Sequence, residues 1–302
     1  MKKAYIFTDL AGGIGNQIFL LEMSKFVSSI NKGNIYLNKF HIDLRHSSGK
    51  STIEDFDLPS TIKFWSQRKS LAYMFSRLKR YMKYINLLPQ NLVLILDDTD
   101  KRLNKKLIEQ YIRERHPKII FIFGFWQSFE FWYDKTDYHL KKGSRSYRLL
   151  LEEQIAINPI IVHYRLGKIG KSWESGWGAL HPEYLLNSLE HIKGDWVPDS
   201  TPVWIFSNDI SYTVNIFKEL IHDSSLNFRF IDSENLSPAE IVLIFSKAKN
   251  LICGNSTMSI AAAKLGKVSN VIIPKELSIK GDTINAIPKN WICIDPIWLD
   301  SF

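Results

Sequence analysis

Cysteine is nearly missing from this sequence, which contains only Cys253 and Cys293 among its 302 residues. Two cysteines cannot form a disulfide framework or a cysteine-rich metal site. Long apolar runs are missing too, because no stretch reaches the roughly 18 unbroken apolar residues that span a bilayer. The apolar run after Lys3 ends at Asp9, which is too early for a signal peptide. These absences predict a reducing, cytoplasmic setting with both cysteines as small buried side chains.

Motifs of several function classes are also absent. The sequence has no helix-turn-helix, zinc-finger or aromatic-basic sheet motif, so we expect no nucleic-acid partner. It has neither the His-Glu-x-x-His spacing of zinc proteases nor the Gly-x-Ser-x-Gly turn of serine hydrolases. Charge is nevertheless unbalanced, with 39 Lys and Arg against 31 Asp and Glu, a net +8. A basic surface of this kind attracts phosphorylated ligands or anionic lipid headgroups.

The basic surplus is concentrated in residues 63–83, which contain seven Lys or Arg and no Asp or Glu. Aromatic residues are interspersed among these cations, among them Trp65, Tyr73 and Phe75. That composition is typical of a helix lying on an anionic membrane surface. We therefore predict peripheral membrane contact through 63–83. A solvated helix whose aromatic side chains pack on their own domain is the alternative, and the sequence leaves both open.

Apolar segments of strand length alternate with helical ones along the chain. A chain of 302 residues suits two domains of about 150. We place an N-terminal domain at 1–157 and a C-terminal, nucleotide-binding domain at 158–302. The expected strands are 4–8, 34–37, 118–123, 160–164, 203–206, 227–231, 251–253 and 271–273. Repeated strand–helix pairs predict an α/β fold of two doubly wound parallel sheets, with ligands beyond the carboxyl ends of the strands.

One helix start is marked strongly. Ser237 is followed by Pro238 and, three positions on, by Glu240. This is a capping box with proline at the first helical position, so we expect a helix from Pro238.

A glycine-rich segment, 12–17, follows the first expected strand. Its residues Gly13, Gly15, Asn16 and Gln17 precede or begin a helix. Glycines let the backbone approach a ligand, and free N–H groups at a helix N-terminus attract an anion. The segment matches neither the dinucleotide fingerprint nor the P-loop. A tight turn with no ligand is the alternative.

Two further segments are candidate sites in the second half. His163 and Arg165 end an expected strand, where an arginine fork can grip a phosphate without metal. Asn255, Ser256 and Thr257 lead into a helix and form a second candidate anion site. A structural salt bridge at Arg165 and a plain helix cap at 255–257 are the alternatives.

The acidic run 97–100 follows an apolar stretch. Asp98 and Asp100 are candidate ligands for a divalent metal. Acidic residues just before a helix are also common as caps and as partners of the helix dipole.

Three of these segments, in order, resemble motifs of the α-1,2-fucosyltransferase family. Residues 12–19 are close to its Gly-Gly-x-Gly-Asn-Gln-x-Phe, 163–165 match the start of its His-x-Arg-Arg-x-Asp, and 255–259 resemble its Asn-Ser-Ser-Phe-Ser. Weaker similarities occur at 124–128, 206–209 and 287–291, so the resemblance spans nearly the whole chain. The family's second arginine is Leu166 here, and its aspartate falls on Lys168.

The resemblance implies a GT-B-like architecture, with two Rossmann-like domains facing a cleft. The N-terminal domain, 1–157, would form the acceptor side, and the C-terminal domain, 158–302, would bind the donor nucleotide. It implies inverting transfer of fucose from GDP-fucose to a glycan acceptor, without cofactor or metal. In bacteria such enzymes build surface polysaccharide such as the O-antigen, often on a lipid carrier at the inner face of the inner membrane. The substitutions at Leu166 and Lys168 leave room for another GDP-linked deoxyhexose as the donor.

The expected chemistry assigns roles to a few residues. Arg165, Ser256 and Thr257 would stabilise the leaving diphosphate, with Lys168 as a further cation near it. The candidate bases are His163, Glu174 and Asp209, in that order. Two other functions stay open: a non-catalytic nucleotide-sugar or glycan-binding protein, and a metal-dependent transferase using Asp98 and Asp100.

Overall fold

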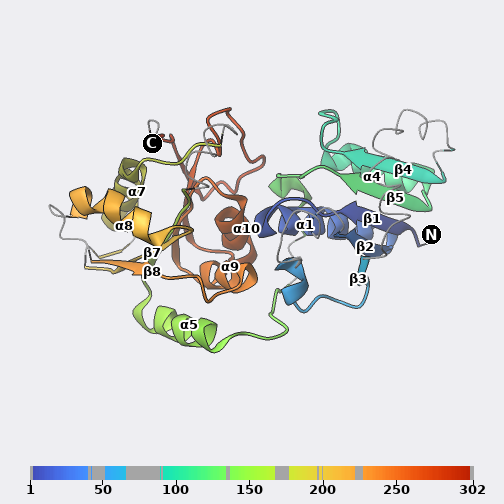
Figure 1. The fold of residues 1–302 in the computed structure, drawn as a ribbon. Helices are drawn as coiled ribbons and strands as arrows, with labels where there is room; N and C mark the ends of the chain where they lie inside the picture. The colour runs from blue at the N-terminus through green and yellow to red at the C-terminus, as the bar shows by residue number, and fades with distance from the viewer. Residues whose placement is uncertain are drawn as a thin grey trace. The chain divides into compact units, whose positions relative to one another are not determined.

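A computed structural model describes most of the chain. The described residues are 3–39, 42, 52–65, 89, 91–133, 137–166, 177–195, 197–198, 200–221 and 227–299. The chain divides into two compact units, Met1–Asp137 and Tyr138–Phe302 (Figure 1). Within the described residues, no helix combines the length and the apolar character needed to cross a membrane.

Unit 1 contains a parallel sheet of five strands in the order β3-β2-β1-β5-β4. The reversal of strand order, where α/β ligands bind, lies between β1 and β5. Helix α1 runs beside β1 and β2 and against α4. The elements are β1 (Tyr5–Asp9), α1 (Ile14–Asn31), β2 (Asn34–Asn38), η1 (Thr52–Asp55), β3 (Ile62–Trp65), β4 (Val93–Asp97), α4 (Lys105–Arg115), β5 (Ile119–Phe123) and η2 (Phe129–Phe131).

Unit 2 contains a parallel sheet of six strands in the order β11-β10-β9-β6-β7-β8. This is the doubly wound dinucleotide-fold order, and its reversal lies between β6 and β9. The elements are α5 (Arg145–Ile157), β6 (Ile160–Tyr164), α7 (Pro182–Asp195), β7 (Val203–Ser207), α8 (Ile210–Ile221), β8 (Phe228–Ile231), α9 (Pro238–Ser246), β9 (Asn250–Ile252), α10 (Thr257–Gly266), β10 (Asn270–Pro274) and β11 (Ile292–Ile294).

Central strands of unit 2 are buried on both faces. Every residue of β6 and β7 is buried, as expected for parallel strands covered by helices on each side. Side chains of β6 alternate between two layers. The Tyr164 ring lies edge-on to Phe217 of α8 at 5.1 Å, whereas the His163 ring lies 5.2 Å from Phe245 of α9. Two helical layers therefore sandwich the sheet.

The two parallel α/β sheets confirm the predicted fold class. The capping box is confirmed as well, because the Ser237 hydroxyl accepts the Glu240 N–H at 3.2 Å and α9 begins at Pro238. Strands β3, β4 and β11 are not among the expected strands. Strands β3 and β11 are short, with four and three residues, and offer little pattern to recognise, whereas β4 has five.

Along the chain, unit 1 ends at Asp137 and unit 2 begins at Tyr138, whereas the sequence placed the domain boundary after residue 157. Helix α5 accounts for the difference. Its Gln154 is buried and donates to the Ile244 carbonyl of α9 at 3.0 Å, and Ser144 before it donates to Glu240 at 2.6 Å. These hydrogen bonds join α5 to unit 2.

Candidate functional site

Three loops converge at the carboxyl end of the unit 2 sheet, where the sequence placed most candidate residues. The Leu166 N–H, after β6, donates to Asn208 Oδ1, after β7, at 2.9 Å. Gly254, after β9, lies so close to the His163 carbonyl that a β-carbon there would clash with it. The strand reversal between β6 and β9 therefore brings the 163–166 and 254–257 segments together.

His163 is enclosed in this arrangement. Its side chain is buried, and Nδ1 lies 3.0 Å from the Ser259 hydroxyl of α10. Burial, assisted by the charge of Arg165, lowers the pKa of His163 to about 3. The imidazole is therefore neutral at physiological pH and is a weak proton acceptor. This geometry favours a positioning role, in which His163 ties β6 to α10; its role as the base stays a prediction.

Arg165 and Leu166 differ sharply in their surroundings. Arg165 follows the last residue of β6 and keeps an exposed surface, although burial by the surrounding residues lowers the pKa of its guanidinium. Leu166 is fully buried in the hydrophobic core of unit 2. A second arginine at 166 would lie in that core without water, which is costly for a charge. Leu166 therefore serves to pack the core. Of the two family arginines, only Arg165 is present to bind a phosphate.

The N-terminus of α10 is the other part of this site. Ser256 is its N-cap and accepts the Met258 N–H at 3.3 Å, while Thr257 is partly exposed. Asn255 is buried and donates to the Gly178 carbonyl at 3.1 Å. Its Oδ1 is buried without a hydrogen-bond partner, as are only Asn31 Nδ2 and Gln154 Oε1 in the described part of the chain. The Thr257 end of the helix offers N–H groups to an anion.

The other candidate site residues of unit 2 are Asp209, Glu174 and Lys168. Asp209 accepts the Tyr212 N–H at 2.9 Å and so caps the start of α8. Glu174 and Lys168 lie outside the described residues. Asn208 and Ser259 were not singled out by the sequence as site residues. Both belong to segments that were similar to family motifs, which was the available signal.

In unit 1, the glycine-rich turn after β1 leads directly into α1. Gly13 is exposed and occupies the N-cap position, where no side chain caps the helix. Asn16 is half-buried and accepts a hydrogen bond from Gln127, after β5, at 2.8 Å. The turn is thus joined to the next strand loop across the strand reversal, as in unit 2.

Gly15 and Gln17, the other two predicted site residues of this turn, are buried in unit 1. Gly15 is buried within α1. Gln17 is buried and donates to the Gly12 carbonyl at 3.0 Å, while its Oε1 receives the Ile53 N–H at 3.4 Å. Gln17 therefore holds the turn in shape. The exposed Gly13 backbone and the Asn16 side chain are the parts that lie open to a ligand.

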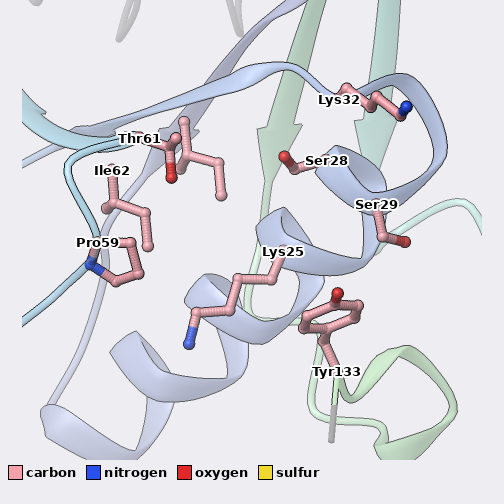
Figure 2. Close-up of a pocket in the computed structure, with 9 residues that line it drawn as sticks. Lys25, Ser28, Ser29, Lys32, Pro59, Thr61, Ile62 and Tyr133 are labelled. Carbon is pink, nitrogen blue, oxygen red and sulfur yellow. The ribbon is translucent and has the colours of Figure 1, made fainter. Parts of the chain in front are cut away.

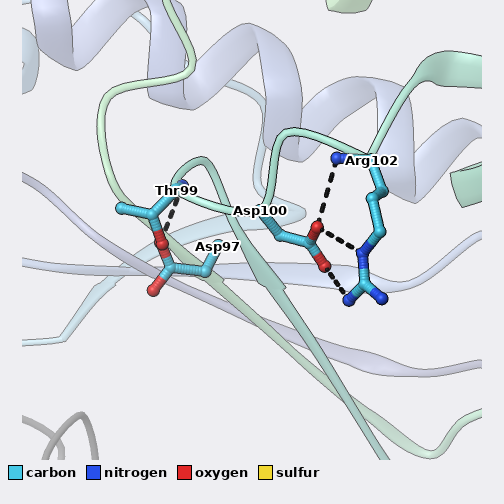
Figure 3. Close-up of polar contacts among 4 residues, drawn as sticks. All are labelled: Asp97, Thr99, Asp100 and Arg102. Atoms are coloured by element: carbon cyan, nitrogen blue, oxygen red, sulfur yellow. Dashed lines mark hydrogen bonds and ion pairs between the residues drawn. The ribbon is translucent and has the colours of Figure 1, made fainter.

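The acidic run 97–100 forms a tight turn (Figure 3). Asp97 accepts hydrogen bonds from the Thr99 N–H and hydroxyl, at 3.0 and 2.8 Å. Arg102 donates to Asp100 through two nitrogens at 2.8 Å each, and these hydrogen bonds lower the pKa of Asp100 to about 2. No group of three His, Cys, Asp or Glu suited to a metal occurs among the described residues. The local partners of these carboxylates favour a structural turn.

A separate cavity of about 580 Å³ lies at the far end of α1, near the amino ends of β2 and β3 (Figure 2). Lys25, buried in α1, forms an ion pair of 2.9 Å with Glu22, and burial lowers the pKa of Lys25 despite this partner. The residues that line the cavity are Lys25, Ser28, Ser29, Lys32, Ile35, Pro59, Thr61, Ile62 and Tyr133. None of them is a predicted site residue, so this cavity is distinct from the sites above.

Solved structures with a similar fold are known. A mutant of Arabidopsis thaliana FUT1 in complex with GDP is 11% identical, with a TM-score of 0.55 over 90% of this chain and 70% of that one. NodZ α-1,6-fucosyltransferase, known from Bradyrhizobium and soaked with GDP-fucose, is 12% identical, with a TM-score of 0.51 over 87% of this chain and 93% of that one. No protein-family model and no curated sequence matches the chain. At these identities the likeness establishes the two-sheet, GT-B-like fold.

Proposed function

We propose that this protein is a glycosyltransferase that moves a sugar from a nucleotide-linked donor to a hydroxyl of a glycan acceptor. The observation that carries the proposal is the placement of Arg165 beside the loop that begins α10. A β-carbon built on Gly254 would lie 3.5 Å from the Arg165 backbone nitrogen, so the exposed cation and the helix N-terminus belong to one small region. A guanidinium and free N–H groups are the donors that a diphosphate requires.

The donor is proposed to be GDP-fucose or a related GDP-linked deoxyhexose. The motif resemblance supports this choice, and the two similar structures are a FUT1 mutant with GDP and a fucosyltransferase soaked with GDP-fucose. Linkage at the 2-hydroxyl rests on the resemblance alone. A chain that bound the donor without turning it over would be the non-catalytic alternative.

The mechanism follows from the charge that develops as the donor breaks. In inverting transfer the acceptor hydroxyl attacks the anomeric carbon while the nucleoside diphosphate leaves with the bonding electron pair. Arg165 and the N–H groups near Thr257 would stabilise the negative charge of that diphosphate, the largest contribution expected in such a site. We propose that this stabilisation needs no metal ion. The base that accepts the hydroxyl proton is proposed to be His163, Glu174 or Asp209. His163 is buried and Asp209 caps α8, whereas Glu174 lies outside the described residues.

The cellular role is proposed from the resemblance and from composition. The acceptor would be a glycan or a lipid-linked oligosaccharide, as in O-antigen synthesis, and the protein would work in the cytoplasm at the inner face of the inner membrane. The segment 63–83 would provide the contact with anionic lipid. Only residues 63–65 of it lie within the described part of the chain, in strand β3.

The proposal is tested by measuring the melting temperature with GDP, UDP, dTDP and CMP. A ligand that binds the native state stabilises it by RT ln(1 + [L]/Kd), so GDP is expected to give the largest shift. GDP release from GDP-fucose would then be followed with and without a panel of glycans. Equal shifts with all nucleotides, or none, would contradict the donor assignment. A GDP shift without any release would indicate the non-catalytic alternative.

A further inference from the structure

The loop after β5 holds an unusual backbone conformation. Gly124 has φ +97° and Trp126 has φ +51°, so two residues that flank Phe125 are left-handed. Glycine adopts this region readily, but a bulky side chain such as that of Trp126 seldom does. Conformations of this kind persist only where surrounding contacts enforce them, and they gather at functional sites.

Contacts from three directions enforce the loop. Asp98, after β4, accepts the Phe125 N–H at 2.6 Å and the Trp126 N–H at 3.4 Å through the same oxygen, Oδ2. The Trp126 indole is buried, donates to the Phe123 carbonyl at 2.7 Å and lies edge-on to Phe131 at 5.1 Å. Gly124 has no side chain, and a β-carbon there would clash with Asp98. The loop is therefore rigid on both sides of Phe125.

Phe125 itself is left accessible, with 43% of its surface exposed. It lies at the carboxyl end of β5, beside the strand reversal of unit 1. Two residues on, Gln127 donates to Asn16 of the glycine-rich turn. A rigid, exposed aromatic ring at this edge of a parallel sheet is a surface on which a ligand can stack.

Asp98 adds a polar group to the same place. Asp98 is partly exposed, and its Oδ2 accepts the loop N–H groups. Its Oδ1 lies against Gly124, and no hydrogen bond to this oxygen is found among the described residues. A carboxylate oxygen accepts hydrogen bonds from hydroxyls and repels a phosphate. These two groups therefore disfavour an anion, and a sugar of a glycan acceptor, with hydroxyl groups and one apolar face, matches both of them.

We infer that Phe125 and Asp98 form a subsite for a pyranose ring of the acceptor. The apolar C–H face of the sugar stacks on Phe125, and a sugar hydroxyl donates to Asp98 Oδ1. This inference rests on the proposed function, because it takes the acceptor to be a glycan.

The test measures direct binding of the methyl glycosides of galactose, glucose, mannose and N-acetylglucosamine, by calorimetric titration without donor. The wild type is expected to bind at least one of them. Phe125→Leu keeps an apolar side chain but removes the ring, and about tenfold weaker binding is expected. Phe125→Trp retains a stacking face and is the matched control, with affinity near that of the wild type. Asp98→Asn keeps an oxygen for the loop N–H groups and is expected to weaken the same glycoside.

The GDP-induced rise in melting temperature provides the internal check for every variant. It should match that of the wild type, since neither Phe125 nor Asp98 belongs to the Arg165 and α10 region that is proposed to hold the diphosphate. Wild-type protein that binds none of the four glycosides would overturn the subsite, and so would Phe125→Leu protein that binds them normally. Glycoside binding that depends on Phe125 in a protein with no nucleotide-dependent shift would support the subsite and contradict the transferase function instead.

Discussion

The Nδ1 atom of His163 lies 3.0 Å from the hydroxyl of Ser259, although 96 residues separate them in the chain. This contact joins the strand that ends before Arg165 to the helix that follows the Asn255–Thr257 segment. Both candidate diphosphate-binding elements of unit 2 are thereby held against each other. The His163 imidazole makes this contact with Ser259 as a buried, neutral group.

The first prediction concerns acid stability. The pKa of His163 is about 3 in the folded protein, below the ordinary value of 6.5, so the unfolded chain binds this proton more tightly. The contribution of neutral His163 to stability is complete above pH 6.5 and is lost as the pH falls toward 3. That loss is about 1.4 kcal/mol per pH unit. His163→Asn should lower the melting temperature at neutral pH but flatten its decline on acidification.

Melting temperatures recorded between about pH 7 and about pH 5 check this prediction. The exposed His191 supplies a control, His191→Asn, whose decline should follow that of the wild type. If the melting temperature of His163→Asn fell with decreasing pH as steeply as that of the wild type, another group would be responsible for the loss of stability in acid.

The second prediction concerns Arg165. Because Arg165 keeps an exposed surface and its guanidinium gains no stabilisation from burial, Arg165→Ala should not lower the melting temperature of the free protein. A hydrogen bond to a charged group contributes about 1.5–3 kcal/mol, so GDP affinity should fall roughly 10- to 100-fold and transfer should be abolished. Titration of the GDP-induced melting shift measures this loss. Arg148→Ala, at another exposed arginine of unit 2, should bind GDP as the wild type does; unaltered GDP binding and turnover by Arg165→Ala would refute the assignment.

The third prediction concerns metal. Since Asp98 Oδ2 accepts the Phe125 N–H and Asp100 is paired with Arg102, transfer activity should be unchanged in excess chelator. Asp100→Ala should likewise retain activity, because its ion pair with Arg102 is exposed. Loss of activity in chelator, restored by a divalent cation, would support the metal-dependent alternative.

The fourth prediction compares two glycines with positive φ. At Gly281, with φ +80°, an added β-carbon would meet only open space, so Gly281→Ala should cost only the backbone strain of about 1–2 kcal/mol. Gly124, at φ +97°, packs against Asp98, so Gly124→Ala should cost distinctly more. Melting temperatures of the two variants give the comparison. A smaller loss for Gly124→Ala than for Gly281→Ala would mean that Asp98 yields easily and that the loop is not rigid.

Local sequence by itself determined many of the helices and strands and some of their ends. The capping box at Ser237 and Glu240 marked the start of α9, since cap hydrogen bonds join residues only three positions apart. Repeated strand–helix pairs predicted β6 and β7 as strands of a parallel sheet. The loops at the carboxyl ends of strands could therefore be named as candidate sites before any strand order was known.

Only the tertiary structure decided which of those loops meet and what each side chain does there. The strand order places His163 beside Ser259 and Gln127 beside Asn16, pairs that no local pattern joins. Burial decided that Leu166 belongs to the core, and the fold made Asp98 an acceptor for loop N–H groups. Such contacts depend on how distant segments pack, and the energies that select them are spread over the whole sheet rather than encoded in adjacent residues.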